Sequence, residues 1–397
     1  MISRPRYMEI FRTYRDVPVI KVLAGIRRCG KSTLLEMLRE ELKQDGVPED
    51  HIVKMSYTSE EFEDGMTDKE MYCGILEKMG GAGQYYLLLD EVQEIEGWEK
   101  AVNSLLEKGN ADIYVTGSNS KLMAGEISTY LSGRYITIPV YTLSFAEYLS
   151  YKESTGRAPR ELLAEYLRLG GFPIVALGDF EEEAAYQIVE GIYHSVISSD
   201  ITRRHDIKNV DLFNRVVKFV VENVGKTFSA NAIVKFLKNE GRALSVEAIY
   251  NYLEWLEKAF VIYRCPRYDL KGKSVLKTQE KFYLADASLK YCMMGFQPES
   301  LAAMLENVVY FELRRKGYEV YIGKKETKEI DFVAVRRDER LYVQVCRSLP
   351  QKSDREVANL LAVRDHYPKY VVTLDEFAGG NIDGVKIVHL MDFLMME

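Results

Sequence analysis

The sequence predicts an α/β protein whose N-terminal part is a parallel sheet with helices between its strands. Short apolar runs alternate with stretches of helical period between Val19 and Val140, which is the pattern of strands joined by crossover helices. A glycine-rich turn follows the first of these runs, and a pair of carboxylates follows a later one. Because the carboxyl ends of parallel strands meet at one edge of the sheet, the same features predict a ligand site there.

The composition is that of a globular protein with reduced thiols. The chain has 397 residues, of which 47% are apolar and 28% charged, enough for two to four domains. Its 5 cysteines include no C-x-x-C pair, so they indicate neither a zinc site nor a redox site. No apolar segment follows residues 1–6, and no apolar run is long enough to span a membrane. We therefore expect a cytoplasmic protein without a membrane partner, and the net charge of −7 argues against a nucleic-acid coat.

The strongest motif is a phosphate-binding loop, or P-loop. It fits G-x-x-x-x-G-K-[ST] at every fixed position, between an apolar strand and a helix over residues 33–42. The glycines let the backbone turn so that its N–H groups face a phosphate, and the helix N-terminus adds the positive end of its dipole. Lys31 would bridge the β and γ phosphates, and Ser32 would ligate Mg²⁺. An ATP site is therefore predicted from Gly25, Ile26, Arg27, Arg28, Cys29, Gly30, Lys31, Ser32 and Thr33.

A second motif supplies the acidic side chains that a P-loop requires. The apolar run Tyr85 to Leu89 ends in Asp90 and Glu91, which places both at the carboxyl edge of the sheet. Asp90 would hold Mg²⁺ through water, and Glu91 would be the base that orients the attacking water. The alternative is a surface acidic pair after a buried strand, and the P-loop upstream favours the catalytic interpretation.

Two further features would complete the site. The strand over residues 113–116 is followed by Ser118 and Asn119, of which Asn119 is our first choice and Ser118 our second for sensing the γ-phosphate. The alternative is ordinary turn chemistry. Arg134 would serve as an arginine finger in its own site or, in a homo-oligomer, in a neighbouring subunit's site. A surface salt bridge is the alternative role for this arginine.

The pattern predicts four segments. Residues 1–142 form the P-loop core, and residues 143–205 have helical spacing, broken at Gly170 and Gly171, that predicts a helical lid. Residues 206–295 contain two helices opening at Ser229 and Ser245 and then a β-ribbon, the arrangement of a winged helix. Residues 296–397 begin with a helix and continue with several strand patterns, which predicts a second α/β unit.

The charges of the predicted winged-helix segment indicate which kind of partner it binds. Residues 207–290 contain 15 Lys and Arg against 9 Asp and Glu, which favours contact with the phosphates of duplex DNA. The second helix, however, carries Glu247, Glu254 and Glu257, which would repel phosphates. The ribbon instead carries the basic side chains, and the candidate DNA contacts are Arg264, Arg267, Lys271, Lys273 and Lys277. A winged helix that docks a protein stays an open alternative.

The sequence resembles the prokaryotic AAA+ superfamily ATPases that carry a winged helix and a C-terminal nuclease-like domain. The resemblance spans nearly the whole chain and implies that fold, that domain order and ATP hydrolysis. One departure is Thr142, where the family pattern leads us to expect proline before Leu-Ser-Phe. The matching segments are residues 25–32, 89–93, 116–120, 131–134, 143–148, 170–173 and 329–333.

The C-terminal segment resembles the PD-(D/E)xK nucleases in the order of its acidic groups. Glu306 on a helix is followed by Glu329 and Asp331 on one strand and by a further strand. The resemblance implies a second metal-binding acid and a lysine on that further strand, but Gln344 and Cys346 occupy the two positions. Gln is a weaker ligand than a carboxylate for a hard divalent cation. We therefore expect a nuclease-like fold that does not cut DNA, with the simple capping of a strand as the alternative role for the acids.

The predicted fold class is thus α/β: a P-loop NTPase of AAA+ type with a helical lid, a winged helix and a second α/β, nuclease-like domain. The predicted function is Mg²⁺-dependent ATP hydrolysis that drives or switches a DNA-associated C-terminal half. The alternative is a regulatory or signalling ATPase whose winged helix and C-terminal domain bind protein partners. An ATP-controlled nuclease is the least favoured hypothesis.

Overall fold

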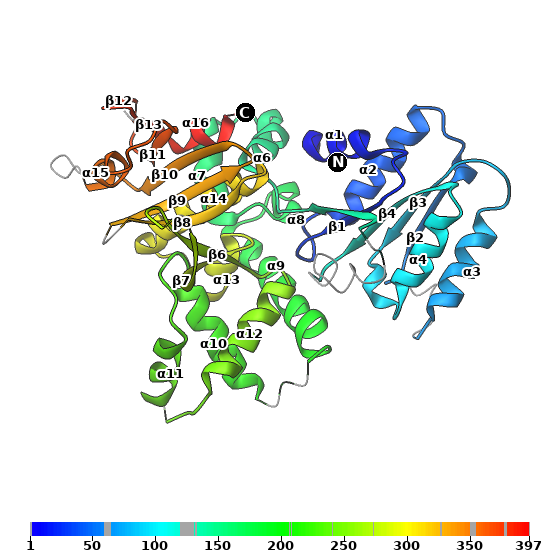
Figure 1. Ribbon diagram of the computed structural model, residues 1–397, viewed down its shortest axis with the longest axis horizontal. Coiled ribbons are helices and arrows are strands. Elements are labelled where there is room, and N and C mark those ends of the chain that lie inside the picture. The colour runs from blue at the N-terminus through cyan, green and yellow to red at the C-terminus, as the bar shows by residue number, and fades with distance from the viewer. Residues whose placement is uncertain are drawn as a thin grey trace. The chain divides into compact units, whose positions relative to one another are not determined.

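Figure 1 shows the computed structural model, which describes residues 2–58, 65–119, 131, 133–205, 207, 209–239, 241–272, 274–325, 328–349, 355–376 and 379–396. The chain divides into two units. The first unit is Met1–Thr142 with Lys258–Phe260, and the second is Leu143–Glu257 with Val261–Glu397. None of the helices in the described ranges combines the length and apolar character needed to cross a membrane.

The first unit is built on a five-stranded sheet in the order β2-β3-β4-β1-β5. Every neighbouring pair in it is parallel, which confirms the predicted fold class. The order places the strand before the P-loop next to β4, the strand that Ser118 follows, so the predicted motifs share one edge of the sheet. The strands are β1 (Ile20–Ala24), β2 (Ile52–Ser56), β3 (Tyr85–Asp90), β4 (Ala111–Gly117) and β5 (Tyr135–Pro139).

Helices flank this sheet, and α1 packs against α2 while α3 packs against α4. The start of α3 is fixed by a capping box, in which Thr67 accepts from the Glu70 N–H and Glu70 accepts from the Thr67 N–H. The buried residues of this unit include a fully buried ion pair between Lys21 and Asp112. The helices are α1 (Pro5–Tyr14), α2 (Lys31–Gln44), α3 (Asp68–Lys78) and α4 (Trp98–Glu107).

The second unit opens with a set of helices. Ser144 and Glu147 form a capping box at the first of them. The predicted break at Gly170 is present: the helix α7 ends at Leu169, and the next helix begins at Pro173. A π-helix over Val196–Thr202 continues α9. The helices are α6 (Phe145–Lys152), α7 (Pro159–Leu169), α8 (Pro173–Leu177), α9 (Glu182–Ser195), α10 (Val210–Glu222), α11 (Ala230–Asn239), α12 (Val246–Lys258) and α13 (Ser288–Met294).

An eight-stranded mixed sheet forms the rest of this unit, in the order β12-β13-β11-β10-β9-β8-β6-β7. The ribbon expected to be a wing is the antiparallel pair β6 and β7, and β6 also pairs in parallel with β8 of the C-terminal segment. One sheet therefore runs across residue 295, and a domain boundary there stays a prediction. The strands are β6 (Ile262–Asp269), β7 (Ser274–Leu284), β8 (Glu319–Lys325), β9 (Lys328–Arg336), β10 (Glu339–Cys346), β11 (Lys369–Thr373), β12 (Gly380–Ile382) and β13 (Val385–His389).

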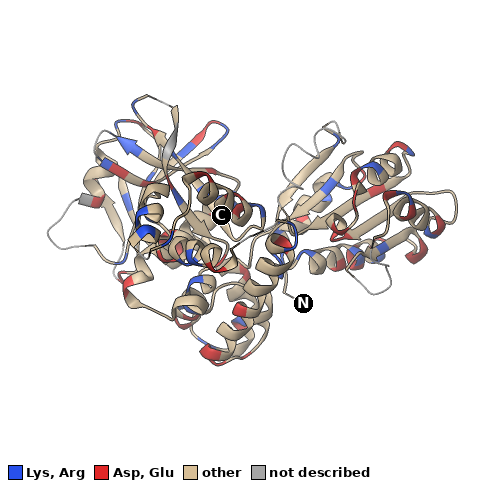
Figure 2. Cartoon of the chain, turned by 90° about the horizontal axis from the view of Figure 1, so that it is seen from below, with Lys and Arg blue, Asp and Glu red and all other residues tan. Residues whose placement is uncertain are grey.

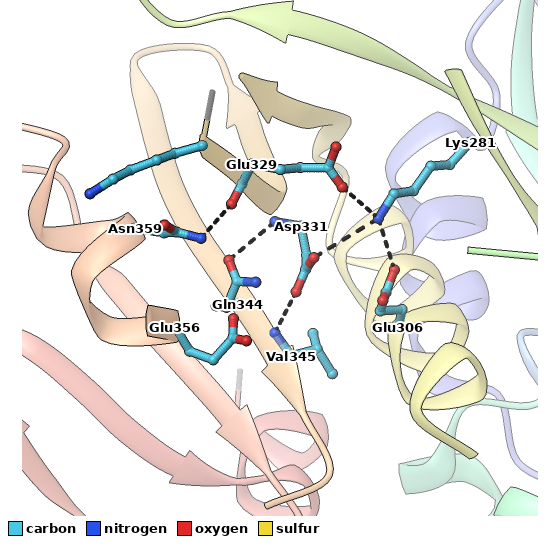
Figure 3. Close-up of a pocket in the computed structure, with 9 residues that line it drawn as sticks. Lys281, Glu306, Glu329, Asp331, Gln344, Val345, Glu356 and Asn359 are labelled. Carbon is cyan, nitrogen blue, oxygen red and sulfur yellow. Dashed lines mark hydrogen bonds and ion pairs between the residues drawn. The ribbon is translucent and has the colours of Figure 1, made fainter. Parts of the chain in front are cut away.

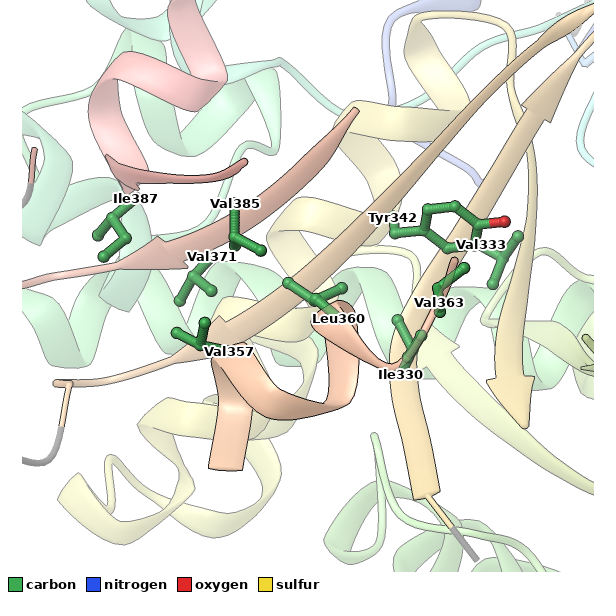
Figure 4. Packing of buried hydrophobic residues seen from close by; sticks show 9 residues of the cluster. All are labelled: Ile330, Val333, Tyr342, Val357, Leu360, Val363, Val371, Val385 and Ile387. Carbon is green, nitrogen blue, oxygen red and sulfur yellow. The ribbon is translucent and has the colours of Figure 1, made fainter. Parts of the chain in front are cut away.

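The C-terminal helices are α14 (Leu301–Arg315), α15 (Arg355–Leu361) and α16 (Leu390–Met395). Figure 4 shows an apolar cluster in which side chains from α15 meet those from β9, β10, β11 and β13. Ile330 lies in this cluster, whereas its neighbour Asp331 lines a polar pocket. Packing of the strands therefore fixes the position of the acidic side chain. The cluster consists of Ile330, Val333, Tyr342, Val357, Leu360, Val363, Val371, Val385 and Ile387.

Candidate nucleotide site and a second charged pocket

The P-loop joins the end of β1 to the start of α2, as the sequence predicts. Gly30 has a φ of 104°, a left-handed conformation that favours glycine. A Cβ added to Gly25 would lie 2.0 Å from the carbonyl oxygen of Val140. Each glycine of the motif is therefore required, one by its backbone conformation and the other by the close approach of a neighbouring backbone.

Lys31 is only 4% exposed and directs its ammonium group to the loop. The group donates hydrogen bonds to the carbonyl oxygens of Gly25 at 3.0 Å and Ile26 at 3.2 Å. Its nitrogen also lies 3.4 Å from Oε1 of Glu91. Burial acts to lower the pKa of Lys31, but the Glu91 carboxylate outweighs it and the pKa is raised. The side chain is therefore a fixed positive charge beside the loop.

Ser32 and Asp90, the two residues predicted to bind Mg²⁺, are in direct contact. The Ser32 hydroxyl donates to Oδ2 of Asp90 at 2.8 Å, and the Thr116 hydroxyl donates to Oδ1 at 2.5 Å. Hydroxyl and carboxylate oxygens are the ligands that Mg²⁺ takes in proteins, so this pair fits the ion. The sequence analysis gave Thr116 no role, although this residue ends the apolar run of β4.

Glu91 has a φ of 55°, an uncommon conformation for a non-glycine residue. Its backbone N–H donates to the Thr116 hydroxyl at 2.9 Å, and its carboxylate accepts from the side-chain amide of Gln93. Burial acts to raise the pKa of Glu91, but the Lys31 ammonium and the Gln93 bond outweigh it and the pKa is lowered. Glu91 is therefore an ionised carboxylate contacted by Lys31 and Gln93, with its backbone held by Thr116. Gln93 is a site residue that the sequence analysis missed.

The predicted γ-phosphate sensors lie beside these groups. Ser118 and Asn119 are 0% and 2% exposed, at the end of the strand that lies between β1 and β3. The Gln93 side-chain nitrogen lies 3.4 Å from the Ser118 hydroxyl, which links Ser118 to Glu91 through one residue. The structure thus brings both candidates to the edge of the sheet that carries the P-loop.

Arg134 lies at the opposite edge. Its carbonyl oxygen accepts from the N–H of Ile20, the first residue of β1, whereas the P-loop follows the last residue of that strand. The strand of 5 residues separates the two positions by about 16 Å. The guanidinium is exposed and forms an ion pair with Glu107 at 2.9 Å. Arg134 therefore does not reach the P-loop of its own chain, and only the role in a neighbouring subunit stays a prediction.

The predicted C-terminal acids gather around a second pocket, of 540 Å³, in the other unit (Figure 3). A lysine that the sequence analysis did not place there, Lys281 of β7, reaches into this acidic group. Its nitrogen lies 3.1 Å from Glu329, 3.3 Å from Glu306 and 3.9 Å from Asp331. The pocket is lined by Lys281, Glu306, Lys328, Glu329, Asp331, Gln344, Val345, Glu356 and Asn359.

Gln344 and Cys346, the two residues that depart from the nuclease pattern, lie in different surroundings. Gln344 lines the pocket, and its side-chain oxygen lies 3.4 Å from the backbone nitrogen of Asp331. Cys346 packs instead against the apolar cluster of Figure 4. Burial raises the pKa of Asp331 well above its ordinary value, and the Glu306 carboxylate adds to this rise. Burial also raises the pKa of Glu306, and the Glu329 carboxylate acts in the same direction. The pocket therefore favours protonation of the pair formed by Asp331 and Glu306.

The basic residues suggested for DNA contact are partly engaged within the protein. Arg264 pairs with Glu257 at 2.7 Å and with Glu280 at 3.3 Å. Arg267 is 9% exposed and pairs with Glu329 at 2.8 Å. Lys271 is exposed, while Lys273 and the side chain of Lys277 lie outside the described residues. Figure 2 shows the acidic and basic residues of the described ranges interspersed in both units.

Comparisons with known proteins agree with the nucleotide-site geometry. Residues 18–149 match the AAA domain family, and residues 160–300 match a domain of unknown function, DUF8612. A relative from Haemophilus influenzae, described as an uncharacterized protein, is 38% identical over 398 residues, covering 100% of this chain and 99% of the relative. Another from Methanocaldococcus jannaschii is 28% identical over 353 residues, covering 85% of this chain and 77% of the relative.

A solved structure shares the fold. A Walker-type ATPase of Pyrococcus abyssi superimposes with a TM-score of 0.51 at 15% identity, covering 74% of this chain and 96% of that chain. Together with the match to the AAA domain family, this similarity identifies the fold of the first unit as that of a P-loop ATPase.

Proposed function

This chain belongs to the family of AAA-domain proteins that includes its Haemophilus influenzae relative, and on that premise we propose that it binds ATP and hydrolyses it with Mg²⁺. The observation that carries the proposal is the contact between Ser32 and Asp90 beside the buried ammonium of Lys31. A hydroxyl and a carboxylate suited to the metal thus lie next to a cation suited to the phosphates.

Each side chain has a role that its contacts support. Lys31 would exchange its bonds to the loop carbonyls and to Glu91 for phosphate oxygens. Ser32 and Asp90 would hold Mg²⁺, which, when bound, neutralises charge on the phosphates. Glu91 would then orient the attacking water, with Gln93 fixing the position of its carboxylate. Ser118, which lies beside Gln93, would sense the γ-phosphate with Asn119.

The test is ATP turnover measured with Mg²⁺ and with excess chelator. We expect turnover only with Mg²⁺, and Lys31→Ala should abolish nucleotide binding because it removes the buried cation. Lys43→Ala is the matched control: it lies on the same helix, α2, and its ammonium pairs with surface carboxylates of Glu40 and Glu49. Equal ATP binding by Lys31→Ala and Lys43→Ala would overturn the proposal.

For the second unit we propose that it is the element driven or switched by ATP, and its partner is either duplex DNA or a protein. The excess of basic residues in 207–290 supports DNA, whereas the ion pairs of Arg264 and Arg267 with carboxylates support a protein partner. Binding to duplex DNA measured at several salt concentrations separates the two. An affinity that falls steeply with salt supports DNA as the partner, and no binding at low salt supports a protein.

A further inference from the structure

Arg4 is buried behind the P-loop and binds two segments of the first unit at once. It is 3% exposed and stands directly before α1. One guanidinium nitrogen donates to the carbonyl oxygen of Cys29, in the P-loop, at 3.0 Å. The other donates to the carbonyl oxygens of Tyr141 at 3.0 Å and Thr142 at 3.5 Å. A single side chain thus joins the phosphate loop to the residues that follow β5.

The bond to Cys29 has a direct consequence for phosphate binding. In a trans peptide the C=O and the following N–H point in opposite directions. With the Cys29 carbonyl held by Arg4, the N–H of Gly30 points away from Arg4, and Gly30 stands immediately before the lysine of the motif. Arg4 therefore orients one of the backbone donors on which a P-loop depends.

Other contacts attach the same P-loop residues to the segment after β5. The Cys29 thiol lies 3.4 Å from the carbonyl oxygen of Val140, and the lack of a side chain at Gly25 lets that oxygen approach. The Tyr7 hydroxyl accepts from the Tyr141 N–H at 3.1 Å. The Arg4 guanidinium also lies over the Tyr7 ring, 4.4 Å from its centre. The segment Val140–Thr142 is thereby fixed to the back of the phosphate loop.

The next residue is held by the second unit. The N–H of Leu143 donates to the carbonyl oxygen of Gly171 at 2.8 Å. The carbonyl oxygen of Leu143 accepts from the Tyr166 hydroxyl at 2.9 Å and from Arg315 at 3.2 Å. The chain therefore passes from the contacts of the P-loop to those of the second unit between two consecutive residues, Thr142 and Leu143.

From these contacts we propose that Arg4 is a positioning residue that couples the phosphate loop to the second unit. Arg4 orients the Gly30 N–H. When the Cys29 peptide moves, Arg4 moves the segment Val140–Thr142 with it, and this movement reaches the next residue, Leu143. This inference rests on the proposed ATP site. A protein that binds the nucleotide but shows no effect on residues 140–143 would refute the coupling and not the ATP site, so the two proposals can be tested separately.

The experiment is hydrogen exchange of the backbone amides of residues 140–143, with and without a saturating, non-hydrolysable ATP analogue and Mg²⁺. In the wild type we expect the analogue to change the exchange rate of the Tyr141 and Leu143 amides. In Arg4→Ala we expect nucleotide affinity to fall about 3- to 10-fold, the effect of one lost hydrogen bond, and the exchange response to disappear even at saturation. Arg4→Lys should restore only part of the response, because an ammonium lacks the planar fork that joins the two segments.

Two variants serve as controls for this experiment. Arg12→Ala changes an exposed arginine of α1, the helix that follows Arg4, and should respond as the wild type does; Arg12 pairs with Glu41. Tyr7→Phe removes only the hydroxyl that binds Tyr141, and should weaken the response without the risk of misfolding that a buried arginine carries. A wild type that binds the analogue without any change at 140–143 would overturn the coupling, and so would an undiminished response in Arg4→Ala or in Tyr7→Phe. Failure of the wild type to bind the analogue would overturn the proposed function instead.

Discussion

The ammonium nitrogen of Lys31 lies 3.4 Å from a carboxylate oxygen of Glu91, so the cation expected to bind phosphate and the carboxylate expected to orient water are paired with each other. Phosphate oxygens would compete with Glu91 for this ammonium. Binding of ATP would therefore release the Glu91 carboxylate for its role in hydrolysis, and the two steps are linked by one contact.

This pairing predicts the behaviour of Glu91→Gln. The neutral amide no longer competes with phosphate for Lys31, so we expect ATP binding as tight as in the wild type or tighter. Turnover should fall about 100-fold or more, the effect expected for loss of a positioned base. Titration with a fluorescent ATP analogue and steady-state rates measure the two effects, with the exposed Glu77→Gln as the control. Wild-type turnover in Glu91→Gln would show that Glu91 is not the base.

Subunit mixing tests Arg134. Because Arg134 lies at the far edge of the sheet from its own P-loop, an arginine finger would have to act on a neighbouring subunit. We expect a mixture of Arg134→Ala and Lys31→Ala subunits to hydrolyse ATP faster than either variant alone. Glu107→Ala, which frees the guanidinium from its ion pair, should leave turnover unchanged. Full activity of a dilute wild-type monomer would refute a role in a neighbouring subunit.

Lys281 is expected to stabilise the second unit. Its ammonium contacts three carboxylates, and removing one partner of a buried ion pair leaves uncompensated charge. Lys281→Met should therefore lower the free energy of unfolding of this unit by about 3 to 5 kcal/mol. The chain has 2 tryptophans, so Trp98→Phe leaves Trp255 as a fluorescence reporter for this unit. Lys328→Met, an exposed lysine of the same pocket, is the control and should have little effect.

Asp331→Asn tests the buried proton of the pocket. The pKa of Asp331 is raised in the folded state, so its carboxyl group stabilises the fold at low pH, where it is protonated. This stabilisation is lost as the pH rises from the pKa of the group in the unfolded chain, about 3.9, through its pKa in the folded protein. Asparagine keeps an oxygen that accepts from the Val345 N–H but carries no charge. We therefore expect Asp331→Asn to melt at a higher temperature than the wild type at pH 8 but not at pH 4. The exposed Asp383→Asn should show no such difference, and the same difference in both variants would argue against a buried proton.

The pocket is not expected to cleave DNA. The ammonium of Lys281 lies among its carboxylates, and Gln344 offers a neutral oxygen where a second acid would strengthen metal binding. Incubation of supercoiled plasmid with the protein and Mg²⁺ or Mn²⁺ should yield no nicked product. Nicking that is lost in Asp331→Ala would contradict this prediction and favour the ATP-controlled nuclease.

The amino-acid sequence was enough to predict those parts of the protein whose chemistry is local. The P-loop is a continuous motif between a strand and a helix, and Asp90 follows an apolar run, so their neighbours in the chain were enough to predict their positions. Glu91, Ser118 and Asn119 follow from the same rule, since the ends of parallel strands meet at one edge.

The side chains that complete these sites from distant parts of the chain could be identified only from the packing of the fold. Arg4 and Tyr141 are separated by 137 positions, and Lys281 and Glu306 by 25, so no periodicity or motif joins them. Because β5 runs parallel to β1, Arg134, which precedes β5, lies at the wrong edge for its own site. The pairing of β6 with β7 and with β8 placed Lys281 among the acids of the C-terminal segment. A sequence pattern specifies which face or end of an element a residue occupies, whereas the packing of elements determines which charges meet.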